Sequence, residues 1–154
     1  LDCLLAEVSR GRAQNTPVAL AILQLDRGAE LLREHGEGAL EAHMEHVAKA
    51  LESSVRQTDL SVKYTTWSLA FILPNTTLEQ ARTVAEKLRG AAAAVKPPWV
   101  GAAPTMSAIV AEASDRANDE REDVVTEWIN RAEFGLEEAQ QNGGDTVLEL
   151  ATPS

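Results

Sequence analysis

The sequence contains a single cysteine, Cys3, so no disulfide can form within the chain. A lone thiol fits a reducing compartment, and we expect the protein to be cytoplasmic. Long hydrophobic runs are also missing. The longest apolar stretches, such as residues 17–23, are far shorter than the ~20 residues that a membrane-spanning helix needs. No signal peptide is visible either, so we expect no membrane span in this segment.

Basic residues are few relative to acidic ones. Lys and Arg total 14 against 24 Asp and Glu, which gives a formal net charge of −10 at pH 7. Binding to a nucleic acid polymer relies on many cationic side chains that neutralise phosphates. The charge balance therefore argues against a nucleic acid polymer as a partner.

The length of 154 residues is usual for one compact domain that buries a core without disulfides or metal. Apolar residues make up 44% and charged residues 25%, so the composition indicates a folded, soluble domain. The sequence begins with Leu1 rather than Met. We expect residues 1–154 to be a single domain taken from a longer multidomain protein.

Hydrophobic periodicity predicts alternating strands and helices. Residues 18–25 form a nearly unbroken apolar run with β-branched members, which is typical of a central strand covered on both faces. Apolar residues recur at helical spacing over residues 37–56 and predict a long amphipathic helix that ends at Arg56. Residues 60–64 and 67–73 are expected to form a β-hairpin that Pro74 closes.

The other expected elements fill the rest of the chain. They are a lead-in helix over 1–14, a short helix over 28–33, a helix from a cap at Asn75 or Thr76 to residue 95, a strand over 105–113, a charged loop over 114–123, a helix over 124–141 and an edge strand over 146–150. This order predicts an α/β fold in which helices flank a mixed central sheet, with the hairpin in the middle of the chain.

A family resemblance rests on several collinear motifs. They include the frame from Arg56 through Asp59, Lys63 and Tyr64 to the segment AFILP, the helix segment AEKLR, and the stretches PVALAILQLD, TMSAIVA and RAEFGLEEAQQNGGDTV. Their order and spacing over almost the whole chain resemble the GGDEF, or diguanylate cyclase, family. The resemblance implies a nucleotidyl-cyclase-like fold in a bacterial signalling protein. It also implies a chemistry in which paired domains condense two GTP molecules into cyclic di-GMP with metal-bound phosphates.

The resemblance also implies where the catalytic groups should lie. The metal-binding carboxylates of the family correspond to Gln24 and Trp67, and neither side chain is an anion. The other degenerate active-site positions are Leu32, Glu41, Thr65, Thr66, Ser68 and Leu69, and the phosphate-binding Lys and Arg of the family correspond to Gln140 and Gly144. We therefore expect no catalytic residue, metal or cofactor, and a domain that is not an enzyme. Asp26 and Glu41 leave open an unusual metal site with residual GTP binding.

An R-x-x-D pattern before the hairpin is retained as Arg56 and Asp59, with Lys87 on the next helix. By resemblance, it implies an inhibitory site for cyclic di-GMP. A guanidinium can bond to guanine or phosphate, and a carboxylate can accept from the guanine amines. The alternative is structural: Arg56 would sit at a helix end and Asp59 would cap the following turn.

A second functional alternative is a non-catalytic interaction or dimerisation module. Its contact surface would be residues 65–67 at the hairpin tip, where we expect Trp67 to be exposed, and its partner would be a neighbouring domain or a second copy. The three histidines, His35, His43 and His46, are not expected to converge on a metal, and we assign them to a surface helix.

Overall fold

The computed structural model describes residues 10, 14–99, 101, 104–112 and 121–150. Its centre is a five-stranded sheet with the strand order β2-β3-β1-β4-β5. The strands are β1 (Val18–Leu25), β2 (Leu60–Thr65), β3 (Ser68–Pro74), β4 (Met106–Glu112) and β5 (Val147–Glu149). The β4–β5 pair is parallel and the other neighbours are antiparallel, so the predicted mixed sheet is confirmed.

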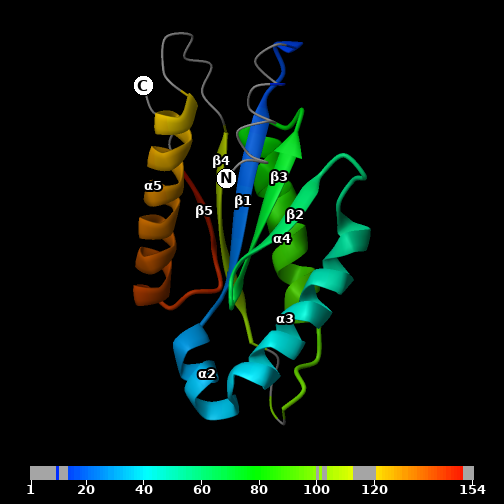
Figure 1. Cartoon of the computed structure of the whole chain (residues 1–154), viewed down its shortest axis with the longest axis vertical. Coiled ribbons are helices and arrows are strands. Elements are labelled where there is room, and N and C mark those ends of the chain that lie inside the picture. The colour runs from blue at the N-terminus through cyan, green and yellow to red at the C-terminus, as the bar shows by residue number, and fades with distance from the viewer. Residues whose placement is uncertain (1–9, 11–13, 100, 102–103, 113–120, 151–154) are drawn as a thin grey trace.

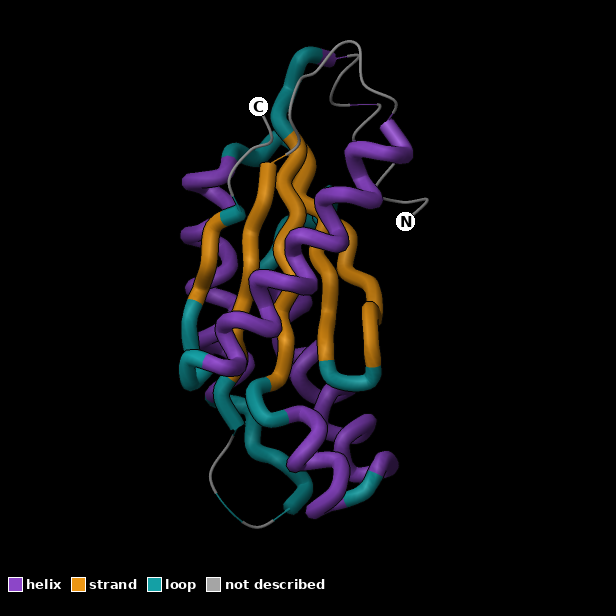
Figure 2. The backbone as a smooth tube through the Cα atoms, turned by 90° about the vertical axis from the view of Figure 1, so that its left-hand side faces the viewer, coloured by secondary structure: helices purple, strands orange, loops and turns teal. Residues whose placement is uncertain are grey.

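Helices cover both faces of the sheet, as the sequence predicted. The helices are α2 (Gly28–His35), α3 (Glu37–Leu51), α4 (Leu78–Ala93) and α5 (Arg121–Gln141). In Figure 1, α5 lies on one side of the sheet, α3 and α4 lie on the other, and α2 lies near the end of the sheet where the hairpin turns. Figure 2 views the sheet from the α5 side and shows the strands running side by side behind that helix. None of the described helices is long and apolar enough to cross a bilayer.

Strand β1 explains why the core has two layers. It pairs with β3 on one side and β4 on the other, and alternate side chains point to opposite faces. Ala21 and Leu23 join the larger core under α3 and α4, whereas Leu20 and Ile22 join the core under α5. A strand that is buried on both faces is apolar at nearly every position, which is why residues 18–25, apolar except for Gln24, could be predicted as a central strand from the sequence.

The long amphipathic helix ends earlier than predicted. Helix α3 stops at Leu51, a 3-10 turn covers Glu52–Ser54, and Val55 is extended with φ −122° and ψ 161°. The prediction that Arg56 ends this helix was wrong. Ser53 bonds back to the Ala50 carbonyl, and such local bonds compete with helix continuation. The extended residue leaves the half-buried Val55 packed against the core and turns the chain toward β2.

The cap of α4 also differs from the prediction. Thr77, rather than Asn75 or Thr76, is the N-cap, because its hydroxyl accepts from the Gln80 amide and the Gln80 side chain accepts from the Thr77 amide. This capping box follows the pattern T-x-x-Q. Thr76 is 3% exposed and bonds to the Pro74 carbonyl instead.

The observed boundaries of several other helices and strands agree with the predicted ones to within a few residues. The helix expected over 28–33 continues to His35, the hairpin strands reach Thr65 and Pro74, and α5 begins at Arg121. The lead-in helix expected over 1–14 falls almost entirely outside the described residues. The same is true of most of the charged loop expected over 114–123.

His43 is buried rather than on a surface. It is 1% exposed, and its ring centroid lies 5.2 Å from that of Trp99, which also stacks on His35 at 4.4 Å. Neither ring nitrogen of His43 has a hydrogen-bond partner in the described part of the chain. The surface assignment was therefore wrong for His43, because Trp99 closes over this side of α3. No metal-binding group of three or more acidic, His or Cys residues occurs within the described ranges.

The burial of His43 predicts a loss of stability in acid. Burial lowers its pKa below the ordinary 6.5, and the nearby His46 lowers it further. The unfolded chain then binds more protons than the folded chain below about pH 6.5, so the free energy of unfolding should fall as the pH drops through that value. Urea unfolding at about pH 7 and pH 5 measures this, and His43→Leu should reduce the acid loss.

The matched control is His46→Gln, since His46 is exposed on the same helix. This change should leave most of the acid loss in place, because burial is the larger cause of the lowered His43 pKa and His46 is the smaller one. An acid loss of equal size in wild type and His43→Leu would assign the effect to other groups.

Candidate functional site

Arg56 and Asp59 form an ion pair at the open end of the hairpin. The Arg56 Nη2 atom lies 2.9 Å from Asp59 Oδ1, and the Arg56 backbone N–H donates to Asp59 Oδ2 at 2.8 Å. The Asp59 side chain is 3% exposed, whereas that of Arg56 is 53% exposed. Asp59 is therefore buried against a partner that still faces solvent.

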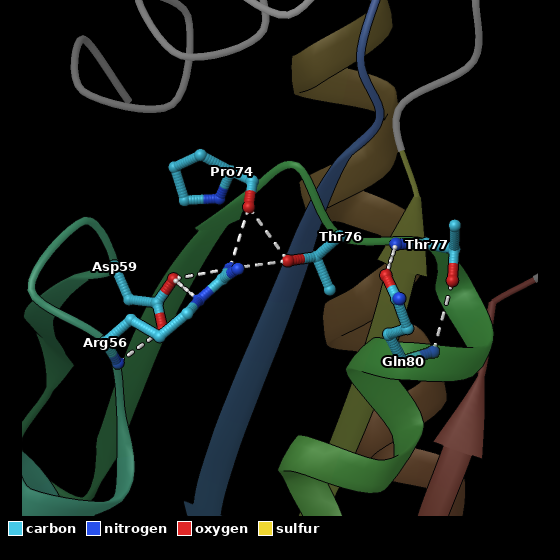
Figure 3. A network of polar contacts seen from close by, with 6 residues as sticks. All are labelled: Arg56, Asp59, Pro74, Thr76, Thr77 and Gln80. Atoms are coloured by element: carbon cyan, nitrogen blue, oxygen red, sulfur yellow. Dashed lines mark hydrogen bonds and ion pairs between the residues drawn. The ribbon is translucent and has the colours of Figure 1, made fainter.

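Arg56 also fastens the far end of β3. Its Nη2 atom donates to the Pro74 carbonyl and to Thr76 Oγ1, both at 2.7 Å (Figure 3). We call this set of Arg56, Asp59, Pro74 and Thr76 the clamp. Nη1 of Arg56 makes no hydrogen bond to a described residue, so one edge of the guanidinium is free to bond elsewhere.

The clamp borders a groove of about 660 Å³, here called the clamp groove. Its described lining residues come from the 3-10 turn after α3, the segment before β2, the residues after β3, and α4: Ser53, Ser54, Val55, Arg56, Asp59, Asn75, Thr76, Gln80, Thr83, Val84 and Lys87. The structure thus brings together all three residues of the predicted R-x-x-D site. Two other cations of α4 point elsewhere, since Arg82 pairs with Glu149 and Arg89 pairs with Glu86 and Asp145.

The tip of the hairpin is packed rather than exposed. Trp67 is half-buried against the main core, and its backbone carbonyl accepts from the Leu25 amide at 2.8 Å. A Cβ atom added to Gly28 would lie 2.6 Å from Trp67 Cγ, so the indole lies directly on the first turn of α2. The expectation of an exposed Trp67 was wrong, because Gly28 leaves room for the ring. The use of residues 65–67 as an interaction surface stays a prediction.

A second cleft, here called the tip cleft, lies between the hairpin turn and α5. It measures about 420 Å³, and its described lining residues are Gln24, Tyr64, Thr65, Trp67, Ser68, Glu133, Leu136, Glu137 and Gln140. The Tyr64 hydroxyl donates to Glu133. Burial and this bond to Glu133 raise the pKa of Tyr64 to about 12, so the hydroxyl stays protonated at neutral pH.

The remaining positions that were predicted to be degenerate lie in a smaller cavity, in the core and in the turn. Glu41 and Leu69 line a smaller cavity of about 140 Å³ together with Lys63 and Thr65. Leu32 is half-buried against the main core, and Thr66 lies beside Trp67 in the turn. The structure therefore divides the predicted positions between two cavities and the core.

The Asp26 carboxylate accepts hydrogen bonds from several groups within the protein. It is 5% exposed and accepts from Thr105, Ser107 and Gln140 side chains and from the Asp145 amide, at 2.6 to 2.7 Å. These donors satisfy both carboxylate oxygens. Glu41 lies in the cavity with Lys63, and no described contact joins it to Asp26.

Sequence reasoning missed the partners of Arg56. Pro74 and Thr76 lie 18 and 20 residues further along the chain. The hairpin register could have indicated them, because Leu60 pairs with Ile72 and this places Asp59 and Arg56 beside the end of β3. The Tyr64 to Glu133 contact spans 69 residues and had no sequence signal.

The sheet order, the two helical layers and the cavities around the hairpin define an α/β domain of the nucleotidyl-cyclase type. The family model described as diguanylate cyclase, GGDEF domain, matches residues 2–146. The chain belongs to the GGDEF domain family.

Solved structures agree with this assignment. SiaD, a diguanylate cyclase from Pseudomonas aeruginosa solved with its activator SiaC, has a TM-score of 0.82 and 25% identity over 97% of this chain. This chain spans 56% of the SiaD chain. The active GGEEF domain of a Vibrio cholerae diguanylate cyclase has a TM-score of 0.80 and 17% identity, covering 96% of this chain and 92% of its own.

A third structure holds a ligand. The GGDEF domain of DgcB from Caulobacter crescentus, solved in complex with c-di-GMP, has a TM-score of 0.77 and 18% identity, with 96% of this chain and 86% of that chain covered. At these identities the last two structures show the fold alone. A comparison with curated protein sequences found no match.

The contact between Trp67 and Gly28 predicts that one methyl group added at position 28 would strongly lower the stability of the fold. Gly28→Ala would force the indole to move and should destabilise the fold by about 1–3 kcal/mol, which chemical denaturation would measure. The matched control is Gly90→Ala in α4, where an added Cβ meets nothing within 4 Å. There the same change should stabilise the helix by about 0.5–1 kcal/mol.

A double variant tests whether the indole is the cause. In a Trp67→Leu background the cost of Gly28→Ala should shrink, because the two residues are in contact. An unchanged cost would show that the added methyl group meets something other than Trp67.

Proposed function

We propose that this GGDEF domain is not an enzyme and that it binds cyclic di-GMP in the clamp groove. The observation that carries the proposal is that Arg56 and Asp59, from the segment before β2, and Lys87, from α4, line one groove. Two cations and a single buried carboxylate line this groove, in a chain whose formal net charge is −10. A groove with a local excess of positive charge favours an anionic ligand such as a cyclic dinucleotide.

Binding would exchange internal bonds for bonds to the ligand. The free Nη1 edge of Arg56 and the exposed Lys87 can meet phosphate oxygens directly. Access to Asp59 requires the ligand to displace Arg56, which holds that carboxylate nearly out of solvent. Because hydrogen bonds to charged groups contribute about 1.5–3 kcal/mol each, this exchange should make the affinity modest.

The proposed loss of catalysis rests on residue chemistry at the hairpin tip. A hard divalent cation needs oxygen ligands, and carboxylates are absent at both corresponding positions, Gln24 and Trp67. The Trp67 ring covers the first turn of α2, where the approach of a phosphate to backbone amides would require open space. We place this domain in a cytoplasmic signalling protein, with neighbouring domains or a second copy as partners.

Calorimetric titration with cyclic di-GMP tests the groove. Wild type should release or absorb heat, and Lys87→Ala should weaken binding about tenfold or more through the loss of a charged contact. Arg56→Ala should weaken it at least as much, but it also loosens the hairpin, so Lys87→Ala is the cleaner variant. The matched control is Arg82→Ala on the same helix, whose side chain pairs with Glu149 and does not line the groove.

Absence of heat with folded wild type would defeat the receptor proposal. Equal affinity in wild type and Lys87→Ala would place the ligand outside this groove.

A product assay tests the proposed loss of catalysis. The domain incubated with GTP and Mg²⁺ or Mn²⁺ should form no cyclic di-GMP, because no pair of carboxylates is available to hold the metal. The active Vibrio cholerae GGEEF domain is the positive control. Metal-dependent product that disappears with chelator would contradict this part of the proposal.

A further inference from the structure

The tip cleft has a charge opposite to that of the clamp groove. Its two ionisable carboxylates, Glu133 and Glu137, lie one helical turn apart on the same face of α5. None of the described residues that line this cleft is Lys, Arg or His. Arg27, the residue before α2, forms ion pairs with Glu30 at 2.6 Å and with Glu34. The cleft therefore presents uncompensated negative charge.

The carboxylates of Glu133 and Glu137 both have oxygen atoms that can accept a hydrogen bond from a ligand. The Tyr64 hydroxyl donates to one oxygen of Glu133, which fixes the carboxylate in place and leaves its second oxygen without a partner among the described residues. Glu137 makes no hydrogen bond or ion pair with the described part of the chain. Since the pKa of Tyr64 is raised to about 12, its hydroxyl keeps its proton at neutral pH and remains a donor to Glu133.

The neutral walls of the cleft suit a flat or methylene-bearing cation. Tyr64 and Trp67 supply aromatic surface, to which ammonium and guanidinium groups are attracted. The half-buried Gln24 has a side-chain amide with no described partner, and its oxygen can accept a further bond. Gln140 is already fixed, because its Nε2 donates to Asp26 and its Oε1 accepts from the Arg27 amide.

We propose that the tip cleft binds a compact organic cation, a guanidinium or primary ammonium group, between Glu133, Glu137, Tyr64 and Trp67. The cation can belong to a free amine or to an arginine or lysine side chain of a partner protein, since the recognising chemistry is the same. The cleft would reject anions, because phosphate or carboxylate groups would meet two like charges there. This site is separate from the clamp groove and does not depend on the proposed binding of cyclic di-GMP.

The test uses the indole N–H signals of the folded domain in NMR. Trp67→Phe assigns the Trp67 signal by its disappearance. Agmatine serves as the free amine and N-acetylarginine amide as a protein-like side chain, each added up to ~10 mM, where even weak sites fill. We expect the Trp67 signal to move in a saturable manner with agmatine. A response to N-acetylarginine amide as well would extend the site to partner side chains.

Charge variants decide whether the carboxylates are responsible. The double change Glu133→Gln and Glu137→Gln should weaken agmatine binding by about tenfold or more. The control is Glu138→Gln, which removes the same charge from an exposed position of α5 that does not line the cleft. Butylurea, which has the shape of an alkylguanidinium without its charge, should leave the Trp67 signal in place.

Three results would overturn the proposal. They are an unmoved Trp67 signal with both cations, an equal response to butylurea, and unchanged agmatine affinity in the double variant. None of these results depends on the outcome of the cyclic di-GMP titration.

Discussion

The packing of the Trp67 indole on Gly28 fastens the hairpin turn to the start of α2. The contact acts together with the Leu25 to Trp67 backbone bond, which extends the pairing of β1 with the hairpin to the residue before the first residue of β3. At the opposite end of the same hairpin, Arg56 joins the segment before β2 to Pro74, the last residue of β3, and to Thr76. The hairpin is thus held at both ends, and the two large cavities lie at these two points of attachment.

The two cavities differ because their charged residues differ. The clamp groove contains Arg56 and Lys87 with a single, paired carboxylate, whereas the tip cleft contains Glu133 and Glu137 without a cation among its described lining residues. Within one small acidic domain, this arrangement separates a surface suited to anions from one suited to cations. The fold is shared with the active GGEEF domain of a Vibrio cholerae diguanylate cyclase, so what each cavity can bind depends on its side chains and not on the course of the backbone.

The polar groups that are buried near the hairpin tip form hydrogen bonds within the protein. Asp26 receives hydrogen bonds from side chains of the β4 region and α5, and Gly144 allows the chain to pass so close that an added Cβ would lie 2.5 Å from that carboxylate. Gln140 joins this network to the backbone of Arg27. Carboxylates satisfied in this way contribute to folding, and they have little capacity left for a ligand.

Sequence alone determined the elements whose signal is local or periodic. Residues 18–25 were predicted to form a central strand because both faces are buried, Pro74 marked the end of the hairpin, and the absence of a carboxylate at Gln24 and Trp67 follows directly from residue identity. The features that depend on contacts between residues far apart in the sequence were decided only by the tertiary structure. The burial of His43 depends on Trp99, the half-burial of Trp67 depends on Gly28, and the bonds of Arg56 depend on Thr76. Periodicity records which face of an element is buried, but not which distant side chain covers it, because that partner is selected only when the layers pack.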